Sequence, residues 1–199
     1  MLMRDLERYR WIVSAGIVDV KKRVIIVLIF TFTLYSLLYI ASTIPLSSEE
    51  ADLLMKEAEE IFKQRFTIID IFLNNFLISL IMLIPVAGPI VGGYIIFTTG
   101  RLLGALSVST GFPPILLISL TIITIYGLIE FLAYGTAFTE SILFTYSIFK
   151  KKTRIESRWL IISIAGTAIL LLAAAALEYT LIQFFGQVYP GVEEFAARI

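Results

Sequence analysis

Four long apolar segments limit what this chain can fold into more than any other feature of its sequence. They cover residues 24–44, 67–110, 114–149 and 159–185, and only short charged stretches separate them. Hydrophobic residues make up 58% of the chain and charged residues 16%, whereas an average soluble chain has about 45–50% apolar and about 25% charged residues. A water-soluble domain of 199 residues could not bury that much apolar surface. The sequence therefore predicts an all-α membrane protein that crosses the lipid bilayer several times.

Helix length divides these segments into five predicted spans. A helix needs roughly 20 residues to cross a hydrocarbon core about 30 Å thick, so the first and last segments are one span each. The second segment is much longer, and Pro85 and Pro89 bracket a glycine near its middle, where a reversal between two helices is expected. A turn at 109–114 then precedes one long fourth helix. The predicted spans of this five-helix transmembrane bundle are about 24–44, 68–84, 89–108, 115–148 and 159–185, within a single transmembrane domain at 24–185.

The uneven distribution of basic residues predicts the orientation of the chain. Positive charge near span ends marks the cytoplasmic side, so both basic regions are expected inside, with the N-terminus cytoplasmic and the C-terminus outside. Five crossings require the same arrangement. The charged leader and the long apolar run after it favour a signal anchor over a cleaved signal peptide, and the predicted location is the cell membrane. The basic residues are Arg4, Arg8, Arg10, Lys21, Lys22 and Arg23 before the first span, and Lys150, Lys151, Lys152, Arg154 and Arg158 before the last.

The segments outside the spans have amphipathic patterns. Ser47 to Glu50 form a capping box, and apolar residues follow at helical spacing, so 47–66 is predicted to be an amphipathic helix on the outer side. Because segment 45–66 carries six acids and three bases, it is also the natural surface for an extracytoplasmic protein partner. The leader 1–23 is predicted to form a cytoplasmic interfacial helix, and 186–199 an outer tail.

Two absent residue types exclude most catalytic chemistry. The chain contains no histidine and no cysteine, so histidine-dependent nucleophiles, thiolate chemistry and histidine zinc sites cannot exist here. It also has no phosphate-binding GxxxxGK[ST] loop, and no aspartate lies in the middle of a predicted span. We therefore expect a protein that is not an enzyme, with no cofactor, no metal site and no nucleic-acid partner.

Ionisable residues inside predicted spans are the first candidates for function, because burying a charge in lipid is costly. They are Arg101, Glu130, Glu140 and Glu178. Glu178 lies near a helix end, where solvation at the membrane surface would be enough to stabilise its charge.

At about 100° per residue, small and polar side chains share one face of the fourth helix. That face consists of Tyr126, Glu130, Ala133, Tyr134, Ala137, Glu140 and Ser141, with Gly127 at its edge. Two interpretations stay open: the face lines a cavity or relay, or it packs as a tight seam in which Glu130 bonds to a neighbouring helix.

The second and third spans supply further candidates. Gly88 and Gly92, and likewise Gly100 and Gly104, have the small-xxx-small spacing that lets helices approach closely in lipid, within one chain or between copies. Asn74 and Asn75 are expected to bond across helices. A direct bond between Arg101 and Glu130 on antiparallel spans would need a tilted or broken helix and is not expected. It is expected to reach outward toward Asn74, Glu178 or lipid headgroups.

The middle of the chain resembles the stage II sporulation protein M family. The resemblance covers about 67–149 and the five-span plan. It rests on the run Phe72-Leu-Asn-Asn-Phe76, the glycine-rich Ile84–Gly93, Thr99-Gly100 with Leu103-Gly104, and Gly127-Leu-Ile-Glu130-Phe-Leu-Ala133. It implies that Asn74 or Asn75, Gly100, Gly127 and Glu130 are signature positions. It also implies a membrane scaffold, like the one that recruits cell-wall hydrolases to the engulfing septum in spore-forming bacteria. Nothing in 45–66 resembles a wall-binding motif, so a sporulation role does not follow.

Two functional hypotheses come from different classes. The first is a non-enzymatic scaffold or assembly factor that self-associates through its glycine-rich faces. The second is a small transporter, channel or lipid-handling permease in which Glu130, Tyr134 and Glu140 line a path beside the Pro85–Pro89 break. Access of water to Glu130 and Glu140 would distinguish them, since transport requires it and a dry seam does not.

Overall fold

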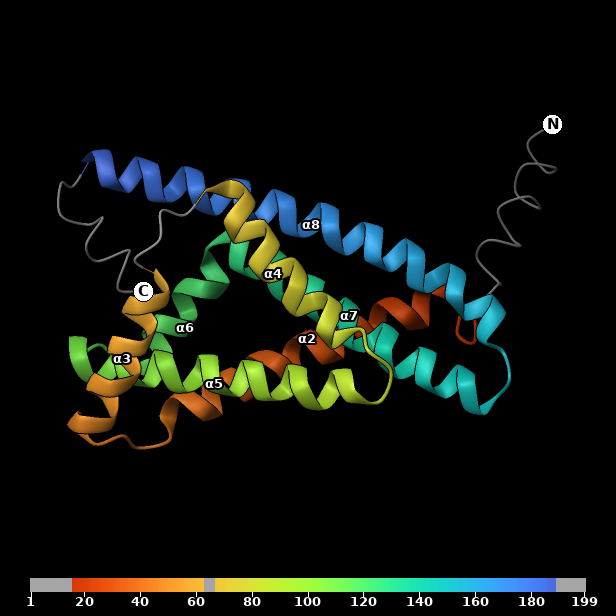
Figure 1. Ribbon diagram of the computed structural model, residues 1–199, viewed down its shortest axis with the longest axis horizontal. Helices are drawn as coiled ribbons and strands as arrows, with labels where there is room; N and C mark the ends of the chain where they lie inside the picture. The colour runs from red at the N-terminus through yellow and green to blue at the C-terminus, as the bar shows by residue number, and fades with distance from the viewer. Residues whose placement is uncertain (1–15, 63–66, 189–199) are drawn as a thin grey trace.

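The computed structural model describes residues 16–62 and 67–188, and these residues form helices without a strand. The leader helix predicted at 1–23 and the tail at 186–199 fall largely outside this range. The capping box is confirmed, because Ser47 and Glu50 hydrogen-bond each other through backbone N–H and side-chain atoms at the start of the outer helix. The helices are α2 Val20–Thr43, α3 Ser48–Phe62, α4 Ile68–Met82, α5 Ala87–Thr110, α6 Pro114–Ile123, α7 Ile125–Phe149 and α8 Thr153–Val188 (Figure 1).

Three of these helices are long and apolar enough to cross a membrane: α2, α5 and α8. The pair α6 and α7 would count as a fourth span if it is one broken crossing. Helix α4 is apolar but has only 15 residues, about 22 Å of helix, which is less than a hydrocarbon core of about 30 Å. By length and composition, the described part of the chain therefore has three or four helical segments that could cross a membrane.

The prediction of one unbroken helix over 115–148 is wrong. Thr124 has an extended backbone conformation, and α6 and α7 meet there at 87°. Gly127 makes this sharp corner possible, because a Cβ on it would lie 2.2 Å from the carbonyl oxygen of Thr121 on the preceding helix. Residues 121–125 are all β-branched, which weakens helix propensity at the corner. Only α7 continues along the bundle, while α6 turns away across one end of it (Figure 1).

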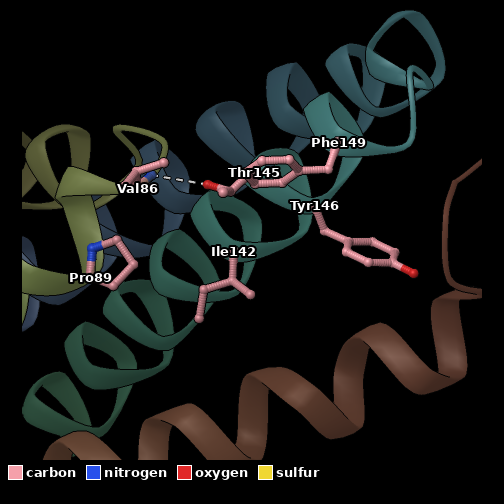
Figure 2. A pocket seen from close by; sticks show the side chains of 6 residues that line it. All are labelled: Val86, Pro89, Ile142, Thr145, Tyr146 and Phe149. Atoms are coloured by element: carbon pink, nitrogen blue, oxygen red, sulfur yellow. Dashed lines mark hydrogen bonds between the residues drawn. The ribbon is translucent and has the colours of Figure 1, made fainter.

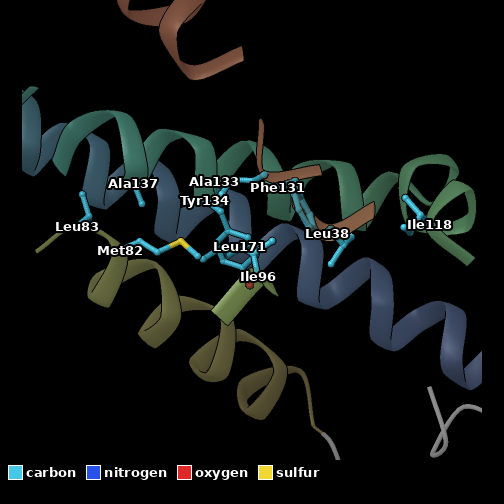
Figure 3. Packing of buried hydrophobic residues seen from close by; sticks show 11 residues of the cluster. Leu38, Met82, Leu83, Ile96, Ile118, Phe131, Ala133, Tyr134, Ala137 and Leu171 are labelled. Carbon is cyan, nitrogen blue, oxygen red and sulfur yellow. The ribbon is translucent and has the colours of Figure 1, made fainter. Parts of the chain in front are cut away.

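The core lies where α7 packs against α8 and α2, with α4 and α5 closing the remaining sides. Leu38, Tyr134 and Leu171 come from three different helices and are almost completely buried in this cluster (Figure 3). Helix α3 packs on α5 at the end of the molecule where α6 lies, and the start of α2, the end of α7 and the start of α8 meet at the opposite end (Figure 1). The bundle thus has two distinct ends, and α7 runs between them.

Candidate functional site

A hydrogen-bonded polar cluster connects α4 to α7 at Glu130. The side-chain amide of Asn75 donates to Glu130 Oε1 at 2.6 Å, and the Tyr134 hydroxyl donates to Asn75 Oδ1 at 3.0 Å. The side chain of Asn74 is exposed and reaches only Asn75, at 3.4 Å. Of the two asparagines, Asn75 makes the expected bond across helices, and Glu130 bonds to a neighbouring helix as the seam interpretation requires.

Helix α8 brings a second carboxylate toward this cluster. Glu178 interacts electrostatically with Glu130 and with Tyr126, and it is partly buried, so its proximity to a helix end does not leave it in open solvent. Among the described residues, no basic side chain forms an ion pair with either carboxylate. Two acids therefore share this part of the bundle, and neither is paired with a cation from residues 16–62 or 67–188.

A buried ion cluster joins α2, α7 and α8 at the opposite end. Arg23 Nη1 donates to Glu140 Oε1 at 2.5 Å, and Nη2 donates to Glu156 Oε1. All three side chains are at most 6% exposed. The sequence predicted Glu140 as a candidate but assigned Arg23 to the charged leader and did not single out Glu156. Both belong to helices of the bundle, because α2 begins at Val20 and α8 begins at Thr153.

The cluster places one guanidinium between two carboxylates. The backbone N–H of Ile17 donates to Glu156 Oε2 at 3.0 Å, and the Trp159 ring stacks on Arg23, with the guanidinium carbon 4.8 Å from the ring centre. Glu140 Oε2 is buried without a hydrogen-bond partner of good geometry, although the Ser163 hydroxyl interacts with Glu140. Removing one member of a buried ion cluster leaves another buried charge without compensation, so this cluster depends strongly on each of its members.

Ser141 holds the turn between α4 and α5. Its hydroxyl donates to the carbonyl oxygen of Ile84 at 2.8 Å, and one helical turn later the hydroxyl of Thr145 accepts the backbone N–H of Val86 at 2.9 Å. Val86 has φ 67° and ψ −54°, and Ala87 N–H donates to Pro85 O at 2.8 Å, which together make a strained γ-turn. Hydrogen bonds with two hydroxyl groups of α7 therefore hold this turn in place.

Arg101 does not bond Asn74 or Glu178, so those two of its expected partners are wrong. Its guanidinium donates to the carbonyl oxygens of Ile44 and Pro45, just beyond the C-terminal end of α2. The last carbonyls of a helix have no partner within it, so a cation placed there satisfies them and also complements the helix dipole. Arg101 is thus a helix cap that ties α5 to α2.

The predicted packing glycines are all buried in close contacts. A Cβ on Gly100 would lie 2.6 Å from the Leu38 carbonyl oxygen, and one on Gly104 would lie 2.8 Å from that of Ser42. Gly88 and Gly92 approach Met82 instead, so they close the α4–α5 hairpin. These four positions therefore hold helices together within one chain.

An open hollow of about 340 Å³ lies beside the α4–α5 turn, away from both polar clusters. The turn and α5 provide Val86 and Pro89, and the last turns of α7 provide the rest of the lining (Figure 2). The lining is mostly apolar and includes neither Glu130 nor Glu140. The α7 side chains are Ile142, Thr145, Tyr146 and Phe149.

These features define a class: an all-helical protein with several membrane-length helices, whose interior polar groups join helices to one another. The described residues contain no group of three or more acidic side chains that could hold a metal ion. The chain matches no protein-family model, no curated protein and no solved structure.

Proposed function

We propose that this chain is a non-enzymatic integral membrane protein that acts as a scaffold or assembly factor for partner proteins. One observation carries the proposal: two clusters of interior polar side chains bond across helices. Asn75 bonds Glu130 across α4 and α7, and Arg23 bonds Glu140 and Glu156 across α2, α7 and α8. Hydrogen bonds between helices fix the positions of the helices relative to one another, as a scaffold that holds partner proteins requires.

The proposed topology has five crossings, with the N-terminus in the cytoplasm. Helices α2, α5, α7 and α8 cross in turn with α4 as a short crossing, and α6 lies along the outer surface. Two features support it. The strained α4–α5 turn bonds to Thr145, one helical turn before the end of α7, which carries the lysine cluster. The start of α2 and the connection between α7 and α8, which carry the two described basic segments 21–23 and 150–158, also lie at the end opposite α3 (Figure 1).

We propose α3 as the surface that binds an extracytoplasmic partner. Ala51 and Ala58 are buried against the bundle, while the acidic side chains of the described part of the helix are exposed. Hydrogen bonds from the Ser47 backbone N–H and hydroxyl hold the pKa of Glu50 below its usual range, so this surface stays negative at neutral pH. The exposed acids are Glu49, Glu50, Asp52 and Glu57.

The resemblance to the stage II sporulation protein M family supports the same proposal. The Asn75–Glu130 bond joins the asparagine-bearing segment to the G-x-x-E segment, two of the elements on which that resemblance rests. We propose that the chain is a relative of that family and that these two residues have a common structural role in it.

Photo-crosslinking in native membranes tests the scaffold function. A photoreactive amino acid in place of Glu57 should yield a discrete adduct with another protein. The same probe in place of Phe32, which is 74% exposed on α2 and faces lipid in the proposed topology, should not. If the position 57 probe gave no protein adduct, the scaffold proposal would be abandoned.

Transport is the second candidate function, and the interacting acids Glu130 and Glu178 favour it, because acidic side chains within membrane helices form the proton relays of pumps and transporters. Glu130→Gln in proteoliposomes distinguishes the candidates. If the chain is a transporter, a proton flux should be lost in this variant and kept in Glu57→Gln. If it is a scaffold, neither variant changes the flux above that of empty vesicles, and Glu130→Gln changes only stability.

A further inference from the structure

The hollow beside the α4–α5 turn lies directly next to a cationic cluster. Tyr146 lines the hollow, and the ammonium group of Lys150 stands 5.4 Å from the centre of the Tyr146 ring. Lys151 and Lys152 follow immediately, and all three lysines are exposed. No carboxylate forms an ion pair with any of them in the part of the chain described here. An apolar surface and an uncompensated positive charge therefore meet at one place.

The size and the lining of the hollow fit an apolar group such as part of an acyl chain. Its volume of about 340 Å³ is near the lower end of the range of about 300–1,000 Å³ that is usual for ligand pockets. It is open rather than enclosed, and Val86 and Phe149 in its lining are 62% and 77% exposed. An acyl chain can enter such a site laterally from the bilayer, whereas a free inorganic anion would gain nothing from the apolar lining.

We propose that the hollow and the lysine cluster 150–152 form a binding site for one anionic phospholipid. One acyl chain lies against Pro89, Ile142 and Phe149, and the phosphate group lies among the three lysines. Basic pockets beside membrane helices bind anionic head groups, which supports this assignment. The site goes beyond the proposed scaffold function, since it requires neither a protein partner nor the family resemblance.

A lipid bound in the hollow would also stabilise the α4–α5 turn. Val86 N–H donates to Thr145 of α7, and the γ-turn around Val86 is strained, so contacts from a lipid would help to fix both. Bound anionic lipid should therefore stabilise the α4–α5 hairpin against α7. A zwitterionic lipid has no net negative charge, so the three lysines should bind it more weakly than an anionic lipid.

Native mass spectrometry of the full chain tests the proposal with phosphatidylglycerol and phosphatidylcholine as probes. The wild type should bind one phosphatidylglycerol at least about tenfold more tightly than phosphatidylcholine, because each lysine near the membrane surface favours an anionic lipid. Two independent changes should each remove this preference: Ile142→Trp, which fills the hollow, and the combined Lys150→Gln, Lys151→Gln and Lys152→Gln. Thermal stability in detergent shows that the variants fold.

Matched controls separate the site from general effects. Ile148→Trp adds the same side chain to α7 outside the hollow, and Arg154→Gln with Arg158→Gln removes exposed charge from the start of α8. Both should keep the preference. Equal binding of the two lipids by the wild type would overturn the proposal. So would an unchanged preference in Ile142→Trp, because the lysines alone would then account for it.

Discussion

Arg23 shows how strongly a single residue can control a buried ion cluster. It is 5% exposed and bonds two carboxylates that are each at most 1% exposed. A buried ion pair adds little net stability compared with apolar residues, because desolvation offsets most of the attraction. Removing one partner is different, since it leaves a buried charge without compensation.

Arg23→Met should therefore destabilise the protein by about 3–5 kcal/mol, as measured by reversible unfolding in mixed detergent micelles. Lys22→Met is the matched control, because Lys22 is the adjacent residue and its side chain is 71% exposed. The control should change stability little. Adding Glu140→Leu and Glu156→Leu to Arg23→Met should restore much of the loss, since no buried charge would remain. A stable Arg23→Met single variant would contradict this account of the cluster.

The residues of the two polar clusters differed in how well the sequence could predict them. Glu130, Tyr134 and Glu140 share a helical face within an apolar helix, so their positions were predictable from periodicity. Arg23 and Glu156 were not predictable in the same way, because they lie in charged segments that also set topology. A signal for Arg23 does exist in its spacing to Thr31, Leu34 and Leu38, the buried face of α2. It becomes informative only when that face is known to be buried, because α2 is apolar all round.

At the scale of helices, close contacts depend on glycines that differ greatly in their surroundings. A Cβ on Gly135 of α7 would lie 2.1 Å from Thr31 Oγ1 and 3.0 Å from the Val27 carbonyl oxygen on α2. A Cβ on Gly93 of α5 would have no atom within 4 Å. The α2–α7 contact therefore requires a glycine, whereas the position on α5 does not.

Gly135→Ala should destabilise the protein by about 1–3 kcal/mol, because the added methyl group overpacks the contact between α7 and α2. Gly93→Ala should be neutral or stabilising by up to about 1 kcal/mol, since alanine has the higher helix propensity and the space is open. The same detergent unfolding assay measures both. Equal effects of the two substitutions would show that α2 and α7 are not packed as closely as described.

The elements themselves were partly predictable. Apolar length and the two prolines predicted helices close to α2, α4, α5 and α8, and the capping box predicted the start of α3. The corner at Thr124 was missed, because it contains neither proline nor a glycine in the turn itself. Two weaker signals were present, the β-branched run 121–125 and Gly127, and they act through crowding between α6 and α7 that only the folded chain reveals.

At the scale of the whole molecule, the short helix α4 decides the proposed topology. Its 15 residues cover about 22 Å, so the α4–α5 hairpin either crosses a thinned bilayer or turns back inside it. The proposed five crossings require that it crosses. The number of crossings between α3 and the lysine cluster is odd in both cases, so labelling of those two regions alone cannot separate them. Labelling at a position in the α4–α5 turn distinguishes a hairpin that crosses the membrane from one that turns back inside it.

Single cysteines test the topology directly, because the natural chain contains none. In intact cells, a membrane-impermeant maleimide should label Glu57→Cys, whereas it should label Lys151→Cys and Ala87→Cys only after the membrane is permeabilised. Ala87 is exposed at the start of α5, so a crossing hairpin presents it to the cytoplasm. Phe32→Cys is the control for a position in lipid and should stay unlabelled throughout. If Lys151→Cys were labelled after permeabilisation and Ala87→Cys were not, the hairpin would be re-entrant and the chain would cross three times. Labelling of Lys151→Cys in intact cells would reverse the orientation.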